Sequence, residues 1–277
     1  MSRKNKKEPV FDRYRLPTNK KKTSLADFDT RDKSCFPDRD EAEVSAADDI
    51  SAIAELQNRL YAEGKRALLI VIQATDTGGK DSTIRKVLGP INPQGVRVTS
   101  FKAPSSIELA HDYLWRIHQA VPAKGMIGVF NRSHYEDVLI VRVHGLAPKE
   151  AIEKRYDQIN DFERHLNENG VTILKFFLHI SKDEQKERLQ ARLDDPSKHW
   201  KFNPGDLEER EHWDDYQDAF EIALNRCSTR HAPWFVIPAD RKWYRNAVIA
   251  RIIRHTLEEL DPHYPEAEYD TEGVIID

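Results

Sequence analysis

The chain contains little cysteine and no long apolar run, and these absences exclude several classes of protein. Cys35 and Cys227 are the only cysteines among 277 residues, too few for a disulfide framework or a Cys-x-x-Cys metal site. No apolar run approaches the ~18 residues that a membrane-spanning helix needs. The first residues also lack the apolar stretch of a secretory signal. We therefore expect a cytoplasmic protein with no membrane partner.

Several catalytic signatures are absent as well. The eleven histidines form no His-x-x-x-His or His-Glu-x-x-His pair, so we do not expect a zinc site. Neither the Gly-x-Ser-x-Gly motif of serine hydrolases nor the dinucleotide-binding Gly-x-Gly-x-x-Gly occurs. The composition, with 39% hydrophobic and 32% charged residues, is that of a globular protein with a substantial core.

The charge is unevenly distributed along the chain. The formal net charge is -4, yet residues 1–22 carry nine Lys or Arg and only two acidic residues. Such a segment can bind nucleic acid or another polyanion, or it can be a solvated terminus. We favour the terminus and expect no nucleic-acid partner. Because residues 1–45 are polar and lack clear periodicity, we interpret them as a basic N-terminal arm, and residues 46–277 as one domain.

Short apolar runs alternate with helical patterns through this domain. The first run, ALLIVIQA, is continuously apolar up to its last two residues, which is typical of a strand buried on both faces. Strands separated by helices indicate a parallel sheet covered on both sides. We predict an α/β fold, a three-layer α/β/α sandwich around a parallel five-stranded sheet. The predicted strands are 67–74, 96–101, 126–130, 171–180 and 234–238.

The helical patterns have recognisable ends. A stripe begins near Asp48 and stops at Gly64, and another spans residues 105–121 as one expected helix. Ser181 and Glu184 form the pattern of a capping box at the start of a further helix. The stretch 194–216, rich in charged, aromatic and turn residues, follows it. We predict a helical lid over about 182–216.

The segment VIQATDTGGKDSTI (71–84) nearly matches the phosphate-binding pattern G-x-x-x-x-G-K-[ST] between a strand and a helix. Ala74 replaces the first glycine, and Asp81 replaces the hydroxyl residue that usually meets Mg²⁺. A double glycine followed by lysine still permits a tight turn with inward-facing N–H groups and a positive charge. The alternative is a glycine-rich turn that binds nothing. The expected phosphate contacts are Thr77, Gly78, Gly79, Lys80, Asp81 and Ser82.

Asp76 lies inside this turn, where a carboxylate would repel phosphate unless a cation lay between them. Mg²⁺ prefers oxygen ligands and retains several waters in protein sites. We therefore predict that Asp76 binds Mg²⁺ directly or through water, and that Asp76 and Lys80 belong to the catalytic set.

Polar side chains also follow the second and third predicted strands. Asn131 occupies the strand end where phosphate-binding proteins usually place an acidic metal partner, and Glu136 and Asp137 follow shortly. Arg132 could contact a transferring phosphoryl group, or it could form a salt bridge with Asp137. Lys102, at the end of the second strand, could bind substrate phosphate or be an ordinary exposed lysine. We assign nucleotide contacts to Lys102, Asn131, Arg132 and Glu136.

The predicted lid is rich in cations. Arg188 and Arg192 are one helical turn apart, and like charges at this spacing cost roughly 0.2–0.5 kcal/mol, a penalty that a bound polyanion would reverse. The alternative is a surface of ordinary ion pairs, since acidic residues lie nearby. We assign polyanion contacts to Arg188, Arg192, Lys198 and Lys201.

Taken together, these motifs resemble polyphosphate kinase family 2 over roughly residues 48–262. The segments that carry the resemblance are QATDTGGKDSTI, NPQGVRVTSFKAPS, HDYLWRIH, GVFNRSHYEDVL, DPSKHWKFNPGDL and PADRKWYRN. Within the family, Asn131 with the following Glu-Asp pair resembles class III, because classes I and II place aspartate at that position. The Thr77-Gly78 pair departs slightly from the small residues of many members.

The resemblance implies a P-loop kinase fold with a helical lid. It implies Mg²⁺-dependent transfer, with Mn²⁺ as a substitute, between inorganic polyphosphate and AMP or ADP, with guanine nucleotides as an open alternative. Asp76 and Asp137 would hold the metal, Lys80 and Arg132 would contact the transferring phosphates, and the lid cations would line the polyphosphate channel. A homodimer or homotetramer is implied as well.

Two rival functions remain at this stage. An ATP-dependent nucleoside monophosphate kinase would use the same fold, and only the phosphate donor would differ. A nucleotide-binding regulator without catalytic activity would use the basic arm to contact nucleic acid, and its affinity would fall steeply with salt.

Overall fold

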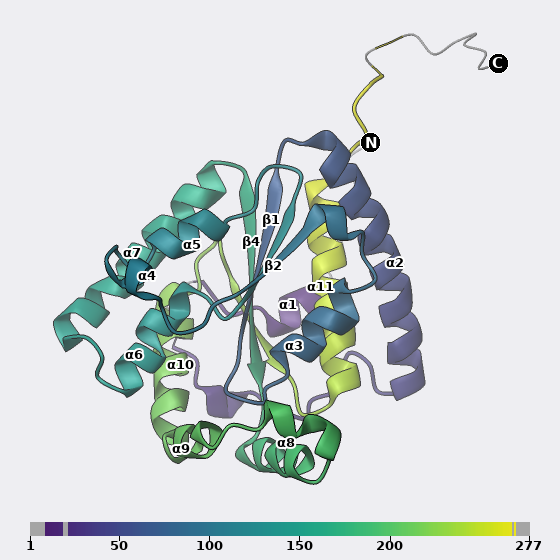
Figure 1. Ribbon diagram of the computed structural model, residues 1–277. Coiled ribbons are helices and arrows are strands. Elements are labelled where there is room, and N and C mark those ends of the chain that lie inside the picture. Colours follow the sequence, from purple (N-terminus) through teal and green to yellow (C-terminus); the bar gives the residue numbers. More distant parts are fainter. Residues whose placement is uncertain (1–8, 19–21, 268, 270–277) are drawn as a thin grey trace.

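The computed structural model describes residues 9–18, 22–267 and 269, and its centre is a sheet of five parallel strands (Figure 1). Every residue of the central strand is buried, as expected for a strand with helices on both sides. The predicted parallel sheet is therefore confirmed. In spatial order its strands are β2 (Val96–Ser100), β3 (Ile127–Asn131), β1 (Ala67–Gln73), β4 (Val171–His179) and β5 (Trp234–Pro238).

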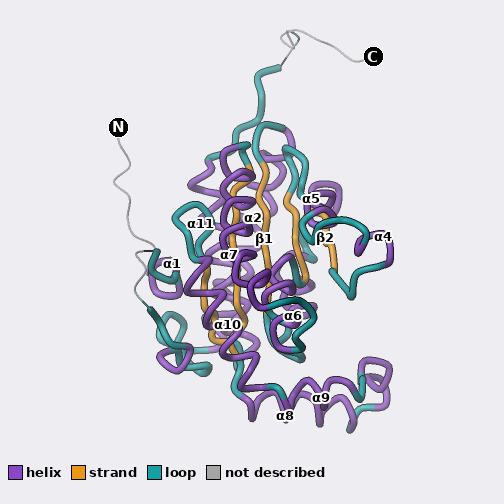
Figure 2. Tube along the Cα trace, turned by 90° about the vertical axis from the view of Figure 1, so that its left-hand side faces the viewer, coloured by secondary structure: helices purple, strands orange, loops and turns teal. Residues whose placement is uncertain are grey.

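Helices cover both faces and complete the predicted three-layer sandwich (Figures 1 and 2). Alternate residues of β1 enter two separate cores, Leu68 and Ile70 on one side, Leu69 and Val71 on the other. No helix in the described ranges is both long and apolar enough to cross a membrane. One layer contains α1 (Pro9–Tyr14), α2 (Arg39–Glu63), α3 (Lys80–Thr83), the π-helical turn Ile84–Leu88 and α11 (Lys242–Leu260). The other contains α5 (Trp115–Ala120), α6 (Ile140–Val143), α7 (Lys149–Glu168) and α10 (Trp213–Cys227).

The lid segment, residues 182–216, lies across the carboxyl ends of the strands (Figure 1). It contains α8 (Lys182–Leu193), the 3₁₀ helix Pro196–Lys201 and α9 (Gly205–Glu211). Ser181 caps α8 by accepting a hydrogen bond from the Glu184 N–H, whereas the Glu184 side chain binds Arg188 instead of completing the capping box. Since parallel strands end at one edge, this segment faces the loops that follow β1 and β3.

The described part of the predicted N-terminal arm is packed into the fold. Val10, Tyr14 and Phe36 are buried in the core beside α11, and Arg15 forms an antiparallel bridge with Phe235 of the edge strand β5. Helix α2 begins at Arg39, so the boundary expected at residue 45 falls inside a helix. The polar composition concealed these contacts because only isolated apolar residues make them. Residues 1–8 and 19–21, which carry much of the basic charge, lie outside the described residues.

The single helix expected over 105–121 is divided into α4 (Ser106–Leu109) and α5. Ser105 and Glu108 form a capping box at the start of α4. Ile107 and Leu109 remain 66% and 69% exposed, so this turn gains no support from the core. The apolar residues in the first half of the expected helix 105–121 are therefore not buried, and the helix is not continuous there.

Candidate active site at the carboxyl edge of the sheet

The turn after β1 is built around close main-chain approaches. A Cβ atom on Gly78 would lie 2.4 Å from the Ala74 Cβ, and one on Gly79 would lie 2.0 Å from an Arg245 nitrogen. Gly79 has φ 101°, a conformation that side chains disfavour. Thr77 adopts φ 60° although it is not glycine, a strained conformation typical of functional turns. Both glycines are thus required where the pattern predicted a phosphate cradle.

Lys80 is held inside this turn by main-chain oxygens. Its Nζ donates to the carbonyl oxygen of Ala74 at 2.9 Å and lies 3.4 Å from that of Thr75. Desolvation lowers the pKa of Lys80, and the Asp76 carboxylate partly opposes this effect. In the described part of the chain its ammonium group makes no ion pair, so an arriving phosphate would be its first anionic contact.

Asp76, Arg132 and Glu136 meet beside the lysine. Arg132 follows the last residue of β3, adopts φ 63°, and donates from Nη2 to the Asp76 Oδ1 at 3.0 Å. Desolvation opposes the charge of Arg132, but Glu136 and Asp76 raise its pKa overall. The pKa of Glu136 is also raised overall: desolvation raises it, and the positive charges of Arg132 and Lys80 offset only part of that rise. These are the contacts of a small, strongly charged centre.

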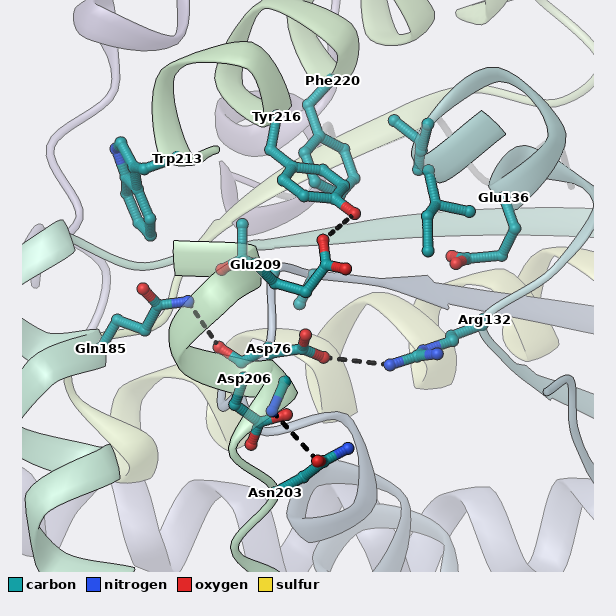
Figure 3. Close-up of a pocket in the computed structure, with 15 residues that line it drawn as sticks. Asp76, Arg132, Glu136, Gln185, Asn203, Asp206, Glu209, Trp213, Tyr216 and Phe220 are labelled. Carbon is teal, nitrogen blue, oxygen red and sulfur yellow. Dashed lines mark hydrogen bonds and ion pairs between the residues drawn. The ribbon is translucent and has the colours of Figure 1, made fainter. Parts of the chain in front are cut away.

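These residues open into a cavity of about 230 Å³ between the turn and the lid segment (Figure 3). Gln185 of α8 donates to the Asp76 carbonyl oxygen at 3.1 Å, and Tyr216 of α10 donates to Glu209 at 2.6 Å. Figure 3 shows Glu209 turned toward Tyr216, and Asp76 turned toward Arg132. Trp213 and Tyr216 both line this cavity, and the sequence indicated them only as part of the aromatic-rich stretch 194–216. Further wall residues to which the sequence gave no role include Asn203, Asp206 and Phe220.

Asp137 does not meet Asp76. Its carboxylate accepts from Arg155 at 3.2 Å, and it lines a second cavity of about 690 Å³ together with Tyr113 and Arg116. Burial raises its pKa to about 6. In the 3₁₀ helix His134–Val138, neighbouring side chains point different ways, so the structure brings Glu136, and not Asp137, to the cavity that Asp76 lines.

The other predicted contacts fall in different places. Asn131 donates from Nδ2 to the Asp81 Oδ1 at 2.6 Å. A residue predicted to contact the nucleotide is thus hydrogen-bonded to one predicted to contact phosphate. Ser82 donates to the Gly79 carbonyl oxygen at 2.9 Å. Lys102 is exposed and lines neither cavity, which favours the alternative of an ordinary surface lysine.

The four predicted lid cations are largely engaged by the protein itself. Arg188 binds Glu184 at 2.7 Å and the carbonyl oxygens of Thr77 and Ala239 at 3.0 and 2.6 Å. These contacts tie the strained turn to α8. The remaining lid cations are Arg192, which pairs with Asp206 at 2.9 Å, Lys198, which pairs with Asp195 at 2.7 Å, and Lys201, which lies over the Trp200 ring at 4.9 Å.

Comparison with known proteins agrees with this geometry. The family model "Polyphosphate kinase 2" matches residues 37–265. The chain belongs to this family. Its fold is that of a P-loop kinase, as predicted, and the protein is a phosphotransferase of the polyphosphate kinase 2 type.

Individual members of the polyphosphate kinase 2 family match over most of their length. The AMP/ADP-polyphosphate phosphotransferase of Meiothermus ruber is 53% identical over 254 residues, which are 91% of this chain and 95% of the relative. The ADP-polyphosphate phosphotransferase of Rhodopseudomonas palustris is 48% identical over 229 residues, 78% of this chain and 79% of the relative. The crystal structure of polyphosphate kinase 2 from Arthrobacter aurescens TC1 superposes with a TM-score of 0.91 at 46% identity, covering 95% of this chain and 93% of that one.

Proposed function

We propose that this protein transfers phosphoryl groups between inorganic polyphosphate and adenine nucleotides, and that both AMP and ADP are acceptors. The observation that carries the proposal is Lys80, whose ammonium group lies inside a glycine turn close to Arg132 and, as far as the structure describes the chain, has only main-chain hydrogen-bond partners. Support for the two acceptors comes from the relative named AMP/ADP-polyphosphate phosphotransferase and from Asn131 at the end of β3.

The proposed mechanism relies on alignment and charge neutralisation, because phosphoryl transfer demands little covalent participation from the protein. Lys80 and Arg132 would bind the oxygens of the transferring group, and Arg132 would exchange its contact with Asp76 for the phosphate. One phosphoanhydride bond breaks in the donor as another forms in the acceptor. The reaction is therefore nearly neutral in free energy and follows concentrations.

Enzymes of this family generally need a divalent metal. Among the described residues, no three His, Cys, Asp or Glu side chains are grouped to hold one. Mg²⁺, however, commonly uses one or two carboxylates together with substrate phosphates and water. Asp76 and Glu136 line the same cavity and fit that requirement. We propose that they hold Mg²⁺, with Mn²⁺ as a substitute, in place of the predicted Asp76 and Asp137 pair; the ion would neutralise charge on the reacting oxygens.

The lid segment would exclude water during transfer. Asp206 and Glu209 of α9 already form one wall of the smaller cavity. Water in that cavity would hydrolyse the donor, and its exclusion also strengthens the contacts of Lys80 and Arg132 with phosphate. The family resemblance further supports a cytoplasmic homodimer or homotetramer.

The decisive experiment is ³¹P NMR of the purified protein with Mg²⁺, long-chain polyphosphate and AMP, without ATP. We expect ADP and then ATP signals to grow as the polyphosphate signal falls. ATP formed from ADP but nothing formed from AMP would contradict the claim that both nucleotides are acceptors. Absence of transfer from polyphosphate, with transfer from ATP to AMP in a parallel tube, would instead establish the monophosphate kinase.

A further inference from the structure

Arg245, in the first turn of α11, is a buried cation whose hydrogen-bond partners within the described ranges are all neutral. Only 1% of the surface of Arg245 is exposed to solvent. Nη2 donates to the Ser82 Oγ at 3.1 Å and to the Asn246 Oδ1 at 2.9 Å. Its Nη1 is buried and has no hydrogen-bond partner among the described residues. A buried guanidinium without a carboxylate is uncommon because desolvation of the charge is left uncompensated.

The position of this guanidinium is defined by the glycine turn. Nη1 lies where a Cβ atom on Gly79 would come within 2.0 Å, so the group packs directly against the turn. Burial, together with the smaller effect of the positive charge on Arg188, lowers the pKa of Arg245 to about 9. The positive charge of Arg245 is therefore buried directly against the turn that contains Lys80.

The surroundings of Arg245 add more positive charge. Lys242, the first residue of α11 and three residues before Arg245, is exposed and makes no ion pair in the part of the chain that the structure describes. Desolvation lowers the pKa of Lys242, Arg188 and Arg245 lower it further, and Glu184 opposes them. Glu184 is already bound to Arg188. Among these groups the three cations Arg188, Lys242 and Arg245 outnumber the carboxylate of Glu184. Two of the cations, Arg188 and Arg245, contact the glycine turn.

We propose that Arg245 and Lys242 are the counter-charge for the phosphate chain that occupies the glycine turn. Arg245 is a positioning residue that acts through Ser82 and the main chain of Gly79, and Lys242 contacts the chain from the solvent side. This inference rests on the proposed function, because a polyphosphate donor supplies the multiple negative charges that two further cations can neutralise.

A purely structural role for Arg245 gives the opposite expectation. If the guanidinium served only to pack α11 against the turn, its removal would destabilise the protein and leave phosphate binding intact. If the Arg245 guanidinium is instead a counter-charge for phosphate, its desolvation destabilises the free protein, and bound polyphosphate offsets that destabilisation. Replacement by an apolar residue of similar length would then leave the free protein as stable or more stable, as seen for other buried ions.

The test compares Arg245→Met with Arg254→Met on the same helix. Arg254 has ordinary partners, since it pairs with the buried Asp49 at 3.1 Å and with Glu258 at 2.8 Å. Melting temperatures are measured without ligand and with tripolyphosphate or long-chain polyphosphate, and KM and kcat are measured for wild type and variants. For Arg245→Met we expect an unchanged or higher melting temperature, a smaller rise on adding polyphosphate, and a KM for polyphosphate increased at least about tenfold. For Arg254→Met we expect a lower melting temperature and an unchanged rise.

Two further variants complete the test. Arg245→Lys keeps the charge and should recover part of the polyphosphate affinity. Lys242→Met, at an exposed position where folding is not at risk, should raise the KM for polyphosphate several-fold, on the order of one lost charged contact. A destabilised Arg245→Met with an unchanged KM, or an unchanged KM in Lys242→Met, would overturn the proposal. If the wild type transfers no phosphoryl group, the proposed function fails, and the polyphosphate-induced melting shifts still decide the inference.

Discussion

The glycine turn and the lid segment both carry the cations that a phosphate-binding enzyme needs, yet the two regions use them differently. Lys80 in the turn has main-chain partners, and Arg245 of α11, which packs against the turn, has neutral side-chain partners. In the lid segment, Arg188, Arg192 and Lys198 each pair with a carboxylate of the same segment. The number of positive charges in a region therefore does not measure the charge that is available to a ligand.

The physical reason lies in the backbone. The turn is a rigid arrangement in which glycines admit close contacts, and the carbonyl oxygens orient Lys80 without neutralising it. In the lid segment Leu193, Trp200 and Leu207 are exposed, and ion pairs such as Arg192 with Asp206 join its parts. Four mutational experiments can break or sharpen this contrast.

Lys80→Ala should have the largest effect. We expect kcat/KM for phosphoryl transfer to fall by about 10³-fold or more, because in the proposed mechanism the ammonium group binds the oxygens of the transferring phosphate. Among the residues that the structure describes, its hydrogen bonds go only to main-chain carbonyls, so the melting temperature should change little. Steady-state kinetics and thermal unfolding measure both quantities. Turnover near the wild-type value would contradict the assignment of the turn as the phosphate site.

Asp76→Asn should come next. We expect kcat to fall roughly 10- to 100-fold and the Mg²⁺ concentration at half-maximal rate to rise, since a neutral amide is a weaker ligand. The substitution also weakens the contact with Arg132. A Mg²⁺ titration of the rate measures the effect. An unchanged Mg²⁺ dependence would remove Asp76 from the proposed metal ligands.

Glu136→Gln and Asp137→Asn form a matched pair of neighbouring carboxylates. The first should reduce kcat on the order of 10-fold or more, whereas the second should alter it less than about fivefold, since Asp137 lies in the other cavity and is paired with Arg155. Both rates are measured at saturating Mg²⁺ and polyphosphate. Equal losses, or a larger loss in Asp137→Asn, would restore the metal pair predicted from the sequence.

Arg192→Met and Lys201→Met should have the smallest effects. We expect Arg192→Met to raise the KM for polyphosphate about two- to fivefold by freeing Asp206, a wall residue of the smaller cavity, and Lys201→Met to change it less than twofold. Adding Asp206→Asn to Arg192→Met should recover most of the loss, because the two residues act as a pair. Additive losses would show that Arg192 binds polyphosphate directly.

The adjacent carboxylates show where sequence reasoning reached its limit. The five strands, the glycine turn and the family were predictable because apolar runs and glycine-lysine spacing are local patterns. The separation of Glu136 from Asp137 was not, since it depends on a 3₁₀ helix after a residue with φ 63°. No periodic pattern spans so short an irregular segment.

Partners distant in the sequence were equally hidden. Arg245 lies 163 residues after Ser82, and nothing in PADRKWYRN indicates that its arginine is buried against a glycine. In the same way, isolated apolar residues such as Tyr14 and Phe36 gave no periodicity, although both are buried against Tyr244.

The sequence by itself determined the architecture and the chemistry of this protein. Buried strands, capped helices and a glycine-lysine turn are dictated by residues close together in the chain, where sterics and hydrogen bonding act locally. Only the tertiary structure decided which charged groups remain available to bind an anionic ligand. Whether Lys80, Arg188 or Arg245 meets a carboxylate, a carbonyl oxygen or no anion depends on elements that fold together from distant parts of the chain, and electrostatic energy is set by those distances and by burial.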